Sequence, residues 1–390
     1  MRFLFVVPPL AGHVNPTVAV AAELAARGHA TAWAGPADVL SGLLPAHARL
    51  FPSGDAEGPE PGGYAALHGR WRDLRGVAAL RFLWAEALVP LALAMVPGVE
   101  RAVAAFAPDV VVADQQALAG AVVARRRGIP WATTASTSAE FTRPFAGFPK
   151  VGAWVADQLA GLLAECGAPP GWDPRFSDRL VLVFSTPELI GGAEPFPDHY
   201  ACVGPAFGSR PPGTDFPWQR LDSDRRRVLV SLGTLNQETG SRFYGAVLAA
   251  GERIADRVQL IVAAPRHLVG PVPAHALVQE AVPQLRLLPH LDAVVSHGGH
   301  NTVCEALAHG LPLVVAPIRD DQPIVAQQVA DAGAGIRVRF GRARPADLYD
   351  ALTAVLEDFG PHRRAARRIQ ASFAAAGGAA AAADRLEKLS

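Results

Sequence analysis

The sequence predicts an α/β protein built from two doubly wound parallel sheets. Short apolar runs alternate with helical segments, and this alternation stops near residue 210 and starts again near residue 228. Unbroken runs of Val, Ile and Leu indicate strands buried on both faces, which is typical of parallel sheets covered by helices. At 390 residues, the chain exceeds what one core usually supports, so we expect two domains of about 200 residues each.

The first half contains a recognisable order of strands and helices. Strands are expected at 3–7, 30–34, 108–114 and 129–133, with helices at 17–27 and 118–127, each stopped by a glycine. The apolar stretch 77–106 predicts a buried or pocket-lining helix that is broken at Pro90 and Pro97.

The second half repeats this order after a Pro- and Gly-rich linker at 204–217. Strands are expected at 228–231, 258–263, 293–296 and 313–316, with a helix at 240–255. The expected division is a domain at 1–207, a linker at 208–222, a second domain at 223–370, and a helix at 371–390 that packs back on the first domain. The Ala-rich terminal helix should kink or split at Gly377-Gly378.

Composition excludes several classes of function. The formal charge is zero, which argues against nucleic acid or an anionic membrane as the main partner. Pro8-Pro9 interrupts the first apolar run, and Ala87–Val99 is shorter than the roughly 20 residues of a membrane span. The three cysteines are widely spaced, without a disulfide or metal pattern. We expect a cytoplasmic monomer or homodimer without stable membrane insertion.

The segment from Ala293 to Glu305 predicts a phosphate site. A strand runs into His297-Gly298-Gly299-His300, and Asn301 or Thr302 is expected to cap the helix that follows. Such a turn presents backbone amides and the positive end of a helix to an anion. Thr302 and His297 add donors, whereas Glu305, one turn in, fits ribose hydroxyls better than phosphate. The alternative is an ordinary strand-to-helix turn that needs glycine.

His13 and Asp114 follow two strands of the first half. The loop 8–16 lacks a Gly-x-Gly-x-x-Gly fingerprint, which disfavours an oxidoreductase. His13 fits a general base for a hydroxyl near neutral pH, and equally a helix-start residue bonded to backbone. Asp114 can orient the imidazole if the fold brings the two together; alternatively, it caps the helix beginning near Leu118.

Two further strand ends carry polar groups. Asp321-Gln322 pairs an acceptor with a group that both donates and accepts, which suits neighbouring sugar hydroxyls. The alternative is a polar loop before a helix, which we would prefer without the neighbouring phosphate site. Ser231-Leu232-Gly233-Thr234 offers a backbone amide and a hydroxyl. Ligands of doubly wound folds bind at such strand ends, so the cleft between the two halves is the expected active site.

These residues together resemble the inverting GT-B glycosyltransferases, the family that contains plant UDP-sugar and bacterial antibiotic and macrolide glycosyltransferases. The resemblance covers essentially the whole chain and is most specific from Val282 to Gln322. It is carried, in order, by the following residues: His13, Asp114, Ser231-Leu232-Gly233-Thr234, Val282-Pro283-Gln284, Leu287-Leu288-Pro289-His290, His297-Gly298-Gly299-His300-Asn301-Thr302, Glu305 and Asp321-Gln322.

The resemblance implies a GT-B fold of two Rossmann-like domains facing a central cleft, with the acceptor on the first and the donor on the second. It implies that His13 is the general base and Asp114 its partner. The matching donor-binding residues are Gly233, Thr234, Val282, Gln284, His297, Gly299, His300, Asn301, Thr302, Glu305, Asp321 and Gln322. It also implies direct displacement with inversion, with a nucleotide-diphosphate sugar as co-substrate, no cofactor and no metal.

Two departures bear on the substrates. Plant members have an aromatic residue that stacks on the base where this chain has Ala281, so UDP and dTDP both stay open. Gly298-Gly299-His300 replaces the plant Cys-Gly-Trp and resembles the bacterial branch, so His300 is expected to reach the donor sugar or phosphate. The expected acceptor is a hydrophobic natural product, for which Trp71, Phe82, Trp84, Phe141 and Phe145 are candidate pocket residues or ordinary core.

The function predicted is therefore hexosyl transfer to a hydroxyl of a small hydrophobic acceptor. A sugar-nucleotide hydrolase or epimerase on the same fold would share the donor site but need no acceptor. A non-catalytic auxiliary partner of a glycosyltransferase is the third possibility, and the presence of both His13 and the donor segment argues against it.

Overall fold

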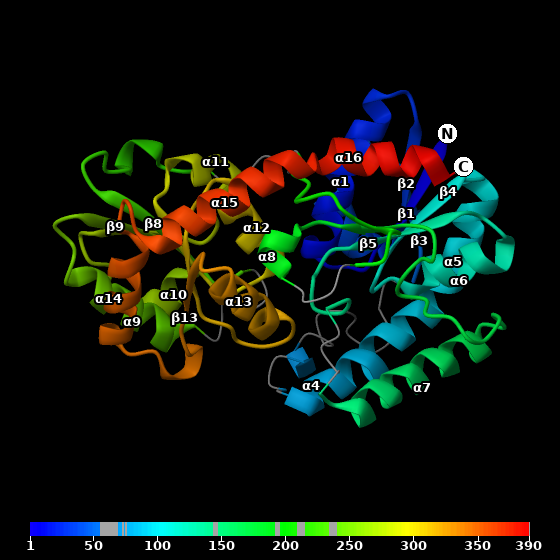
Figure 1. Cartoon of the computed structure of the whole chain (residues 1–390), viewed down its shortest axis with the longest axis horizontal. Coiled ribbons are helices and arrows are strands. Elements are labelled where there is room, and N and C mark those ends of the chain that lie inside the picture. Colours follow the sequence, from blue (N-terminus) through cyan, green and yellow to red (C-terminus); the bar gives the residue numbers. More distant parts are fainter. Residues whose placement is uncertain are drawn as a thin grey trace. The chain divides into compact units, whose positions relative to one another are not determined.

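The computed structural model describes residues 1–54, 69–71, 74, 76–142, 147–191, 196–208, 215–233 and 240–389. The chain divides into two compact units (Figure 1). Unit 1 contains residues 1–184, 194–211 and 376–390, and unit 2 contains 185–193 and 212–375. The expected assignment of 185–193 to the first domain is wrong, because Leu189 is buried in the core of unit 2.

Within the described residues, unit 1 has a seven-stranded parallel sheet in the order β3-β2-β1-β4-β5-β6-β7. Its strands are β1 (Arg2–Val6), β2 (Ala30–Gly35), β3 (Leu50–Pro52), β4 (Val110–Asp114), β5 (Trp131–Ala135), β6 (Val181–Val183) and β7 (Tyr200–Cys202). Strand order reverses between β1 and β4, so the expected doubly wound topology is confirmed for this unit.

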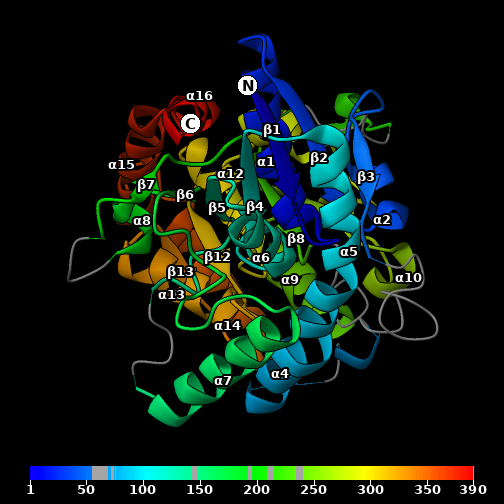
Figure 2. The ribbon, with the colours of Figure 1, turned by 90° about the vertical axis from the view of Figure 1, so that its right-hand side faces the viewer.

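Helices cover both faces of this sheet. One core cluster lies under α5 (Val89–Phe106), α6 (Leu118–Arg127) and α7 (Pro149–Glu165), and Figure 2 shows α5 and α6 against the strands. The other lies under α1 (Ala11–Ala26), α2 (Ala37–Leu43) and α16 (Gly378–Leu386). The strands are thus buried on both faces, as their unbroken apolar runs predicted.

Within the described part of unit 2, a six-stranded parallel sheet has the order β10-β9-β8-β11-β12-β13. Its strands are β8 (Arg226–Ser231), β9 (Val258–Ala263), β10 (Ala276–Gln279), β11 (Ala293–Ser296), β12 (Leu313–Val315) and β13 (Gly335–Arg337). Its helices are α8 (Pro187–Ile190), α9 (Ser241–Glu252), α10 (Arg266–Val269), α11 (Gln284–Leu287), α12 (His300–Ala308), α13 (Gln322–Asp331), α14 (Pro345–Val355) and α15 (Pro361–Ala376). The reversal point, where ligands bind in such sheets, lies between β8 and β11.

Three expectations about helices near prolines are wrong. Helix α1 begins at Ala11 rather than near Thr17, because Pro16 sits early in the helix and removes only one backbone hydrogen bond. The stretch Gly76–Phe106 is one continuous helix rather than a helix broken at Pro90 and Pro97. A π-helical segment at Leu83–Leu88 widens the helix just before Pro90, which gives the proline ring room. Pro97 lies inside α5.

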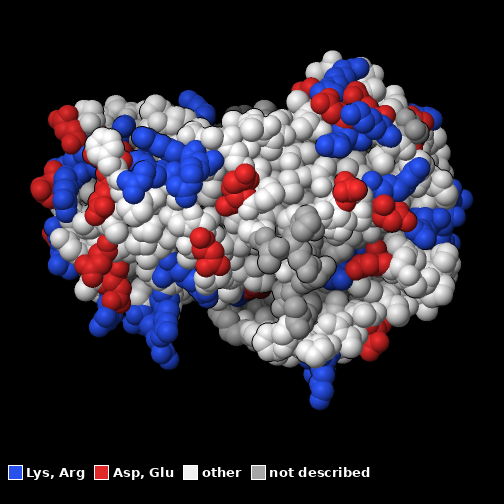
Figure 3. Space-filling model, in the orientation of Figure 1, with Lys and Arg blue, Asp and Glu red and all other residues white. Residues whose placement is uncertain are grey.

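The helix Gly76–Phe106 is also long and apolar enough to cross a membrane by length and composition, although its most apolar window is half buried within the protein. Basic and acidic side chains both occur on each unit in the face shown in Figure 3, in keeping with the zero formal charge.

Glycine divides the C-terminal helix as expected. Gly377 has φ of 88°, which ends α15 and starts α16. Helix α16 packs on α1, where Ala382, Ala383 and Leu386 are buried. In the expected linker, residues 209–214 lie outside the described residues, and Phe216 is already buried in the core of unit 2.

Candidate active site

In unit 1, strand register brings His13 and Asp114 together. Val6 at the end of β1 pairs with Ala113 in β4, so the loop into α1 and the residue after Ala113 lie at the same edge of the sheet. His13 Nδ1 lies 2.8 Å from Asp114 Oδ1. The contact that the sequence left open is present, and the alternative is wrong, because Ala117 is the N-cap of α6.

The Asp114 carboxylate is buried and held by several donors. It is 1% exposed. The Gln116 backbone N–H donates to Oδ1 at 2.9 Å, and the hydroxyls of Thr134 and Ser136 donate to Oδ2 at 3.3 and 2.7 Å. A buried carboxylate is costly unless its lone pairs are occupied, so this set of donors keeps Asp114 in place beside His13.

Ser136 also reaches His13, with its Oγ 2.6 Å from Nδ1. Ser136 follows β5, which pairs with β4, so it lies at the same edge of the sheet. Ser136 is not among the site residues predicted from the sequence. The available signal was its position directly after a buried strand beside the strand that carries Asp114.

In unit 2, His297 follows β11 at the reversal point of the sheet. Ser296 pairs with Ser231 at the end of β8, which places Gly233 against the ring. A Cβ atom at Gly233 or at Gly299 would lie 2.6 Å from the imidazole, so both positions require glycine. Gly298 has φ of 90°, and a Cβ there would meet Val315 at 2.9 Å. The turn therefore needs glycine, as expected, because a side chain would come too close to its neighbours.

Burial lowers the pKa of His297 to about 4, so the ring is neutral near pH 7. The ring is 8% exposed and donates to the Ser231 backbone carbonyl, and its Nδ1 has no hydrogen-bond partner among the residues that the structure describes. Because buried polar atoms are normally hydrogen-bonded, the His297 Nδ1 is suited to a hydrogen bond with a bound ligand.

Helix α12 begins at His300, with Gly299 as its N-cap, so the expectation that Asn301 or Thr302 caps it is wrong. Asn301 and Thr302 lie partly exposed in its first turn, where helix amides suit an anion. The His300 ring is buried and lies 3.5 Å from Cys304 Sγ, one turn further along its own helix.

Gln284 and Glu305 are brought together from α11 and α12. Gln284 Nε2 donates to Glu305 Oε2 at 2.6 Å, and Glu305 is 2% exposed. Val282, just before α11, is partly buried against the core of unit 2. The amide and carboxylate thus share one polar cluster near the phosphate-type turn.

The loop after β12 adds an arginine that is not among the site residues predicted from the sequence. Arg319 is 5% exposed, and its Nε lies 3.4 Å from Asp320 Oδ2. Gln322 Oε1 accepts from the backbone N–H groups of Ile318 and Arg319 at 2.9 and 3.1 Å. Gln322 therefore shapes this loop with its carbonyl, which leaves only its amide group for a sugar, while the neighbouring Asp321 is partly exposed.

Most of the candidate acceptor residues are core. Phe82 and Trp84 are 4% and 1% exposed and belong to the core cluster of unit 1. Phe141 is 8% exposed and packs edge-on against Phe196. Trp71 is partly buried and stacks on Phe82. Phe145 and, in unit 2, Thr234 lie outside the described residues.

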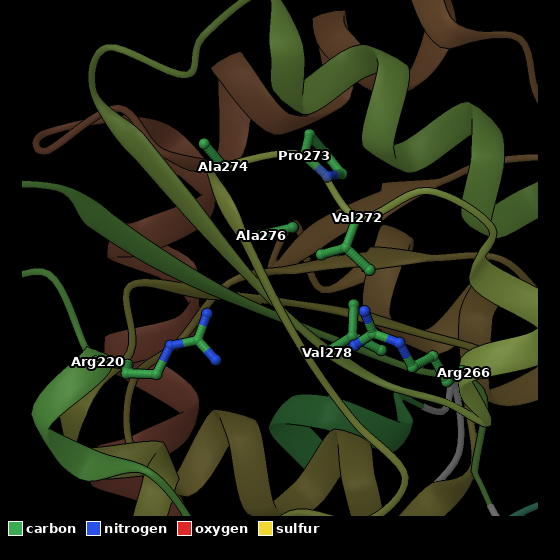
Figure 4. Close-up of a pocket in the computed structure, with 7 residues that line it drawn as sticks. All are labelled: Arg220, Arg266, Val272, Pro273, Ala274, Ala276 and Val278. Atoms are coloured by element: carbon green, nitrogen blue, oxygen red, sulfur yellow. The ribbon is translucent and has the colours of Figure 1, made fainter.

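Two pockets on the described surface are lined by none of the predicted site residues. The pocket of about 270 Å³ in Figure 4 lies along edge strand β10 of unit 2, with Arg220 and Arg266 among its lining residues. An apolar pocket of about 400 Å³ in unit 1 lies between α7 and the loop through Trp172. Among the described residues, no group of three or more His, Cys, Asp and Glu side chains could hold a metal ion.

Comparison with known proteins shows the family to which this chain belongs. Residues 247–389 match the family model described as the C-terminal domain of erythromycin biosynthesis protein CIII-like proteins. The chain is 31% identical to demethyllactenocin mycarosyltransferase of Streptomyces fradiae, covering 99% of this chain and 86% of that protein. It is 29% identical to 4'-demethylrebeccamycin synthase of Lentzea aerocolonigenes, covering 100% and 99%.

The structure of CalG4, the calicheamicin glycosyltransferase, matches with a TM-score of 0.78 and 26% identity over 100% of this chain and 98% of that one. The two doubly wound units are thus those of a GT-B glycosyltransferase. The chain belongs to the family of antibiotic and natural-product glycosyltransferases and is itself a glycosyltransferase.

Proposed function

We propose that this protein is a metal-independent, inverting glycosyltransferase. It would move a hexose from a UDP- or dTDP-sugar to a hydroxyl of a hydrophobic natural product. The observation that carries the proposal is the His13–Asp114 pair, 2.8 Å apart at the reversal point of unit 1, where such sheets bind ligands. The names of relatives that act on demethyllactenocin and calicheamicin support a natural-product acceptor.

In this mechanism, His13 Nε2 takes the proton of the acceptor hydroxyl as its oxygen attacks the anomeric carbon. The new carbon–oxygen bond forms on the face of the anomeric carbon opposite the bond to the diphosphate. That bond breaks at the same time, and the diphosphate leaves with the electron pair. Configuration therefore inverts, and no covalent enzyme intermediate is needed. Asp114 stabilises the imidazolium that His13 becomes.

The leaving diphosphate would be held by the turn before α12, with His297, Asn301 and Thr302 around it. The helix amides and the nearby Arg319 guanidinium offer positive potential where negative charge develops. This supply of positive groups supports our proposal that no metal is required. The carbonyl of Gln284 and the Glu305 carboxylate would accept from the ribose hydroxyls, and Asp321 would accept from the sugar hydroxyls.

The charge pattern and the three cysteines, none of which forms a disulfide, support a cytoplasmic location. The contacts that support the proposed base all lie within unit 1, and those that support the proposed donor site all lie within unit 2.

The test combines donor binding with product analysis. A thermal-shift panel of UDP- and dTDP-sugars, with EDTA present, should reveal the donor through its stabilisation of the folded chain. NMR of the product should show the inverted anomeric configuration. His13→Ala should lower kcat by about 10²- to 10⁴-fold, whereas His47→Ala, at an exposed position in the same unit, should not.

Near-normal turnover by His13→Ala would overturn the assignment of the base. Loss of donor at the same rate with and without acceptor would indicate a sugar-nucleotide hydrolase or epimerase. Failure of every nucleotide-sugar to bind would point to an auxiliary protein without chemistry.

A further inference from the structure

Ser136 occupies the position between the two members of the dyad. Its Oγ lies 2.6 Å from His13 Nδ1 and 2.7 Å from Asp114 Oδ2, while Nδ1 itself lies 2.8 Å from Oδ1. Ser136 is 4% exposed, so bulk water does not compete well for these contacts. The imidazole, carboxylate and hydroxyl therefore form a closed ring of three short contacts at the Nδ1 side of the His13 imidazole.

Two hydrogens have to be placed in this ring: the serine hydroxyl hydrogen and one imidazole hydrogen. The hydroxyl can donate either to Asp114 Oδ2 or to His13 Nδ1. A hydrogen bond to an ionised carboxylate is roughly twice as strong as one between neutral groups. The hydroxyl hydrogen therefore goes to Asp114, and the oxygen lone pair faces Nδ1.

This arrangement decides the tautomer of His13. With Ser136 Oγ and Asp114 Oδ1 both acting as acceptors beside it, Nδ1 carries the ring hydrogen. The other ring nitrogen, Nε2, then has the lone pair that a base needs. The opposite tautomer would set Nδ1 against a carboxylate without a hydrogen between them, and its Nε2–H could not accept a proton.

We propose that Ser136 is a positioning residue that holds His13, together with Asp114, in the tautomer that accepts a proton from the acceptor hydroxyl. The proposal rests on the proposed role of His13 as the base. Ser136 acts through His13 and does not touch the reacting atoms.

Removing the Ser136 hydroxyl should leave the rest of the site assembled. Asp114 keeps the Gln116 amide at Oδ1 and the Thr134 hydroxyl at Oδ2. The change at position 136 therefore removes the second acceptor at Nδ1 rather than the carboxylate itself. Because this affects the reactive form of the base more than substrate binding, the loss should fall on kcat.

The experiment compares wild type with Ser136→Ala, Ser136→Thr and Ser177→Ala. Ser177 is a buried serine of the same unit that bonds the Trp131 carbonyl at 2.8 Å at the start of β5, so it controls for loss of a buried hydroxyl. Long-range proton–nitrogen NMR of the ¹⁵N-histidine enzyme reads the tautomer without substrate, with His13→Gln identifying the signal. Initial rates with donor and acceptor supply kcat and KM.

We expect the Nδ1–H tautomer in wild type and in Ser136→Thr, and a raised Nε2–H population in Ser136→Ala. In Ser136→Ala, kcat should fall in proportion to the loss of the Nδ1–H form, by up to about tenfold, the factor of one ordinary hydrogen bond, while acceptor KM stays within about twofold. An Nε2–H tautomer in wild type would overturn the proposal, as would equal losses in Ser136→Ala and Ser177→Ala or an unchanged kcat in Ser136→Ala. Unchanged turnover of His13→Gln would instead refute the proposed base, whatever the tautomer.

Discussion

Acid should destabilise this protein in part through His297. Burial lowers the pKa of His297 from 6.5 to about 4, and the Arg319 charge adds to this, while Asp321 and the bond to the Ser231 carbonyl oppose it. The unfolded chain therefore binds more protons between these two values. The free energy of unfolding contributed by this group is greatest above pH 6.5 and falls as the pH drops toward about 4.

The size of the effect follows from the two pKa values. The full difference corresponds to about 3 kcal/mol, of which about 2 kcal/mol is lost between about pH 7.5 and about pH 5. Urea unfolding of wild type, His297→Gln and His47→Gln at both pH values measures it. Glutamine cannot take up the proton, so His297→Gln should lose about 2 kcal/mol less on acidification than the other two.

An equal loss in all three proteins would refute the reasoning, because the imidazole of His297 would then carry none of the pH dependence. The same pKa makes a second measurement possible. Binding of UDP or dTDP next to the ring should favour its protonated form, so calorimetry near pH 5 should detect proton uptake that His297→Gln lacks.

Three further predictions concern named contacts. Asp114→Asn should lower kcat by about 10²- to 10⁴-fold with little change in KM, while Asp109→Asn, whose carboxylate is part-exposed, should retain activity. Gln322→Leu should lower the free energy of unfolding by about 2 kcal/mol, since two backbone N–H groups lose their acceptor; an unchanged urea midpoint would contradict this. A double-mutant cycle of Gln284→Leu and Glu305→Leu should show about 1–3 kcal/mol of coupling in the free energy of UDP or dTDP binding. Additive effects would contradict this, because the two residues would then contribute to binding independently.

The sequence predicts the limits of a helix or strand correctly where the residues of that element alone mark its two ends. Strands β9 and β11 and helix α6 have the expected limits, because buried Val, Ile and Leu runs or a terminal glycine mark their ends. The predicted helix limits are wrong where prolines occur, at α1 and within Gly76–Phe106. A proline removes one hydrogen bond, and early helix position or a π-helical turn can absorb that loss, which the sequence pattern does not display.

The candidate acceptor residues show the same limit for side chains. From the sequence alone, an aromatic residue that lines a pocket cannot be distinguished from one that fills a core. The structure places Trp84 in the core. Burial depends on the surrounding helices and not on the residue type alone.

The sequence by itself determined which chemical groups stand at the ends of the strands: His13, Asp114, and the turn from His297 to Glu305. Only the tertiary structure decided what these groups touch. The β1–β4 register sets His13 beside Asp114, and the β4–β5 register brings Ser136, 123 residues from His13, against both. The reason is that hydrogen bonding between neighbouring strands aligns backbone segments distant in the chain to within one residue, so a contact of 2.6 Å depends on pairing that no local pattern encodes.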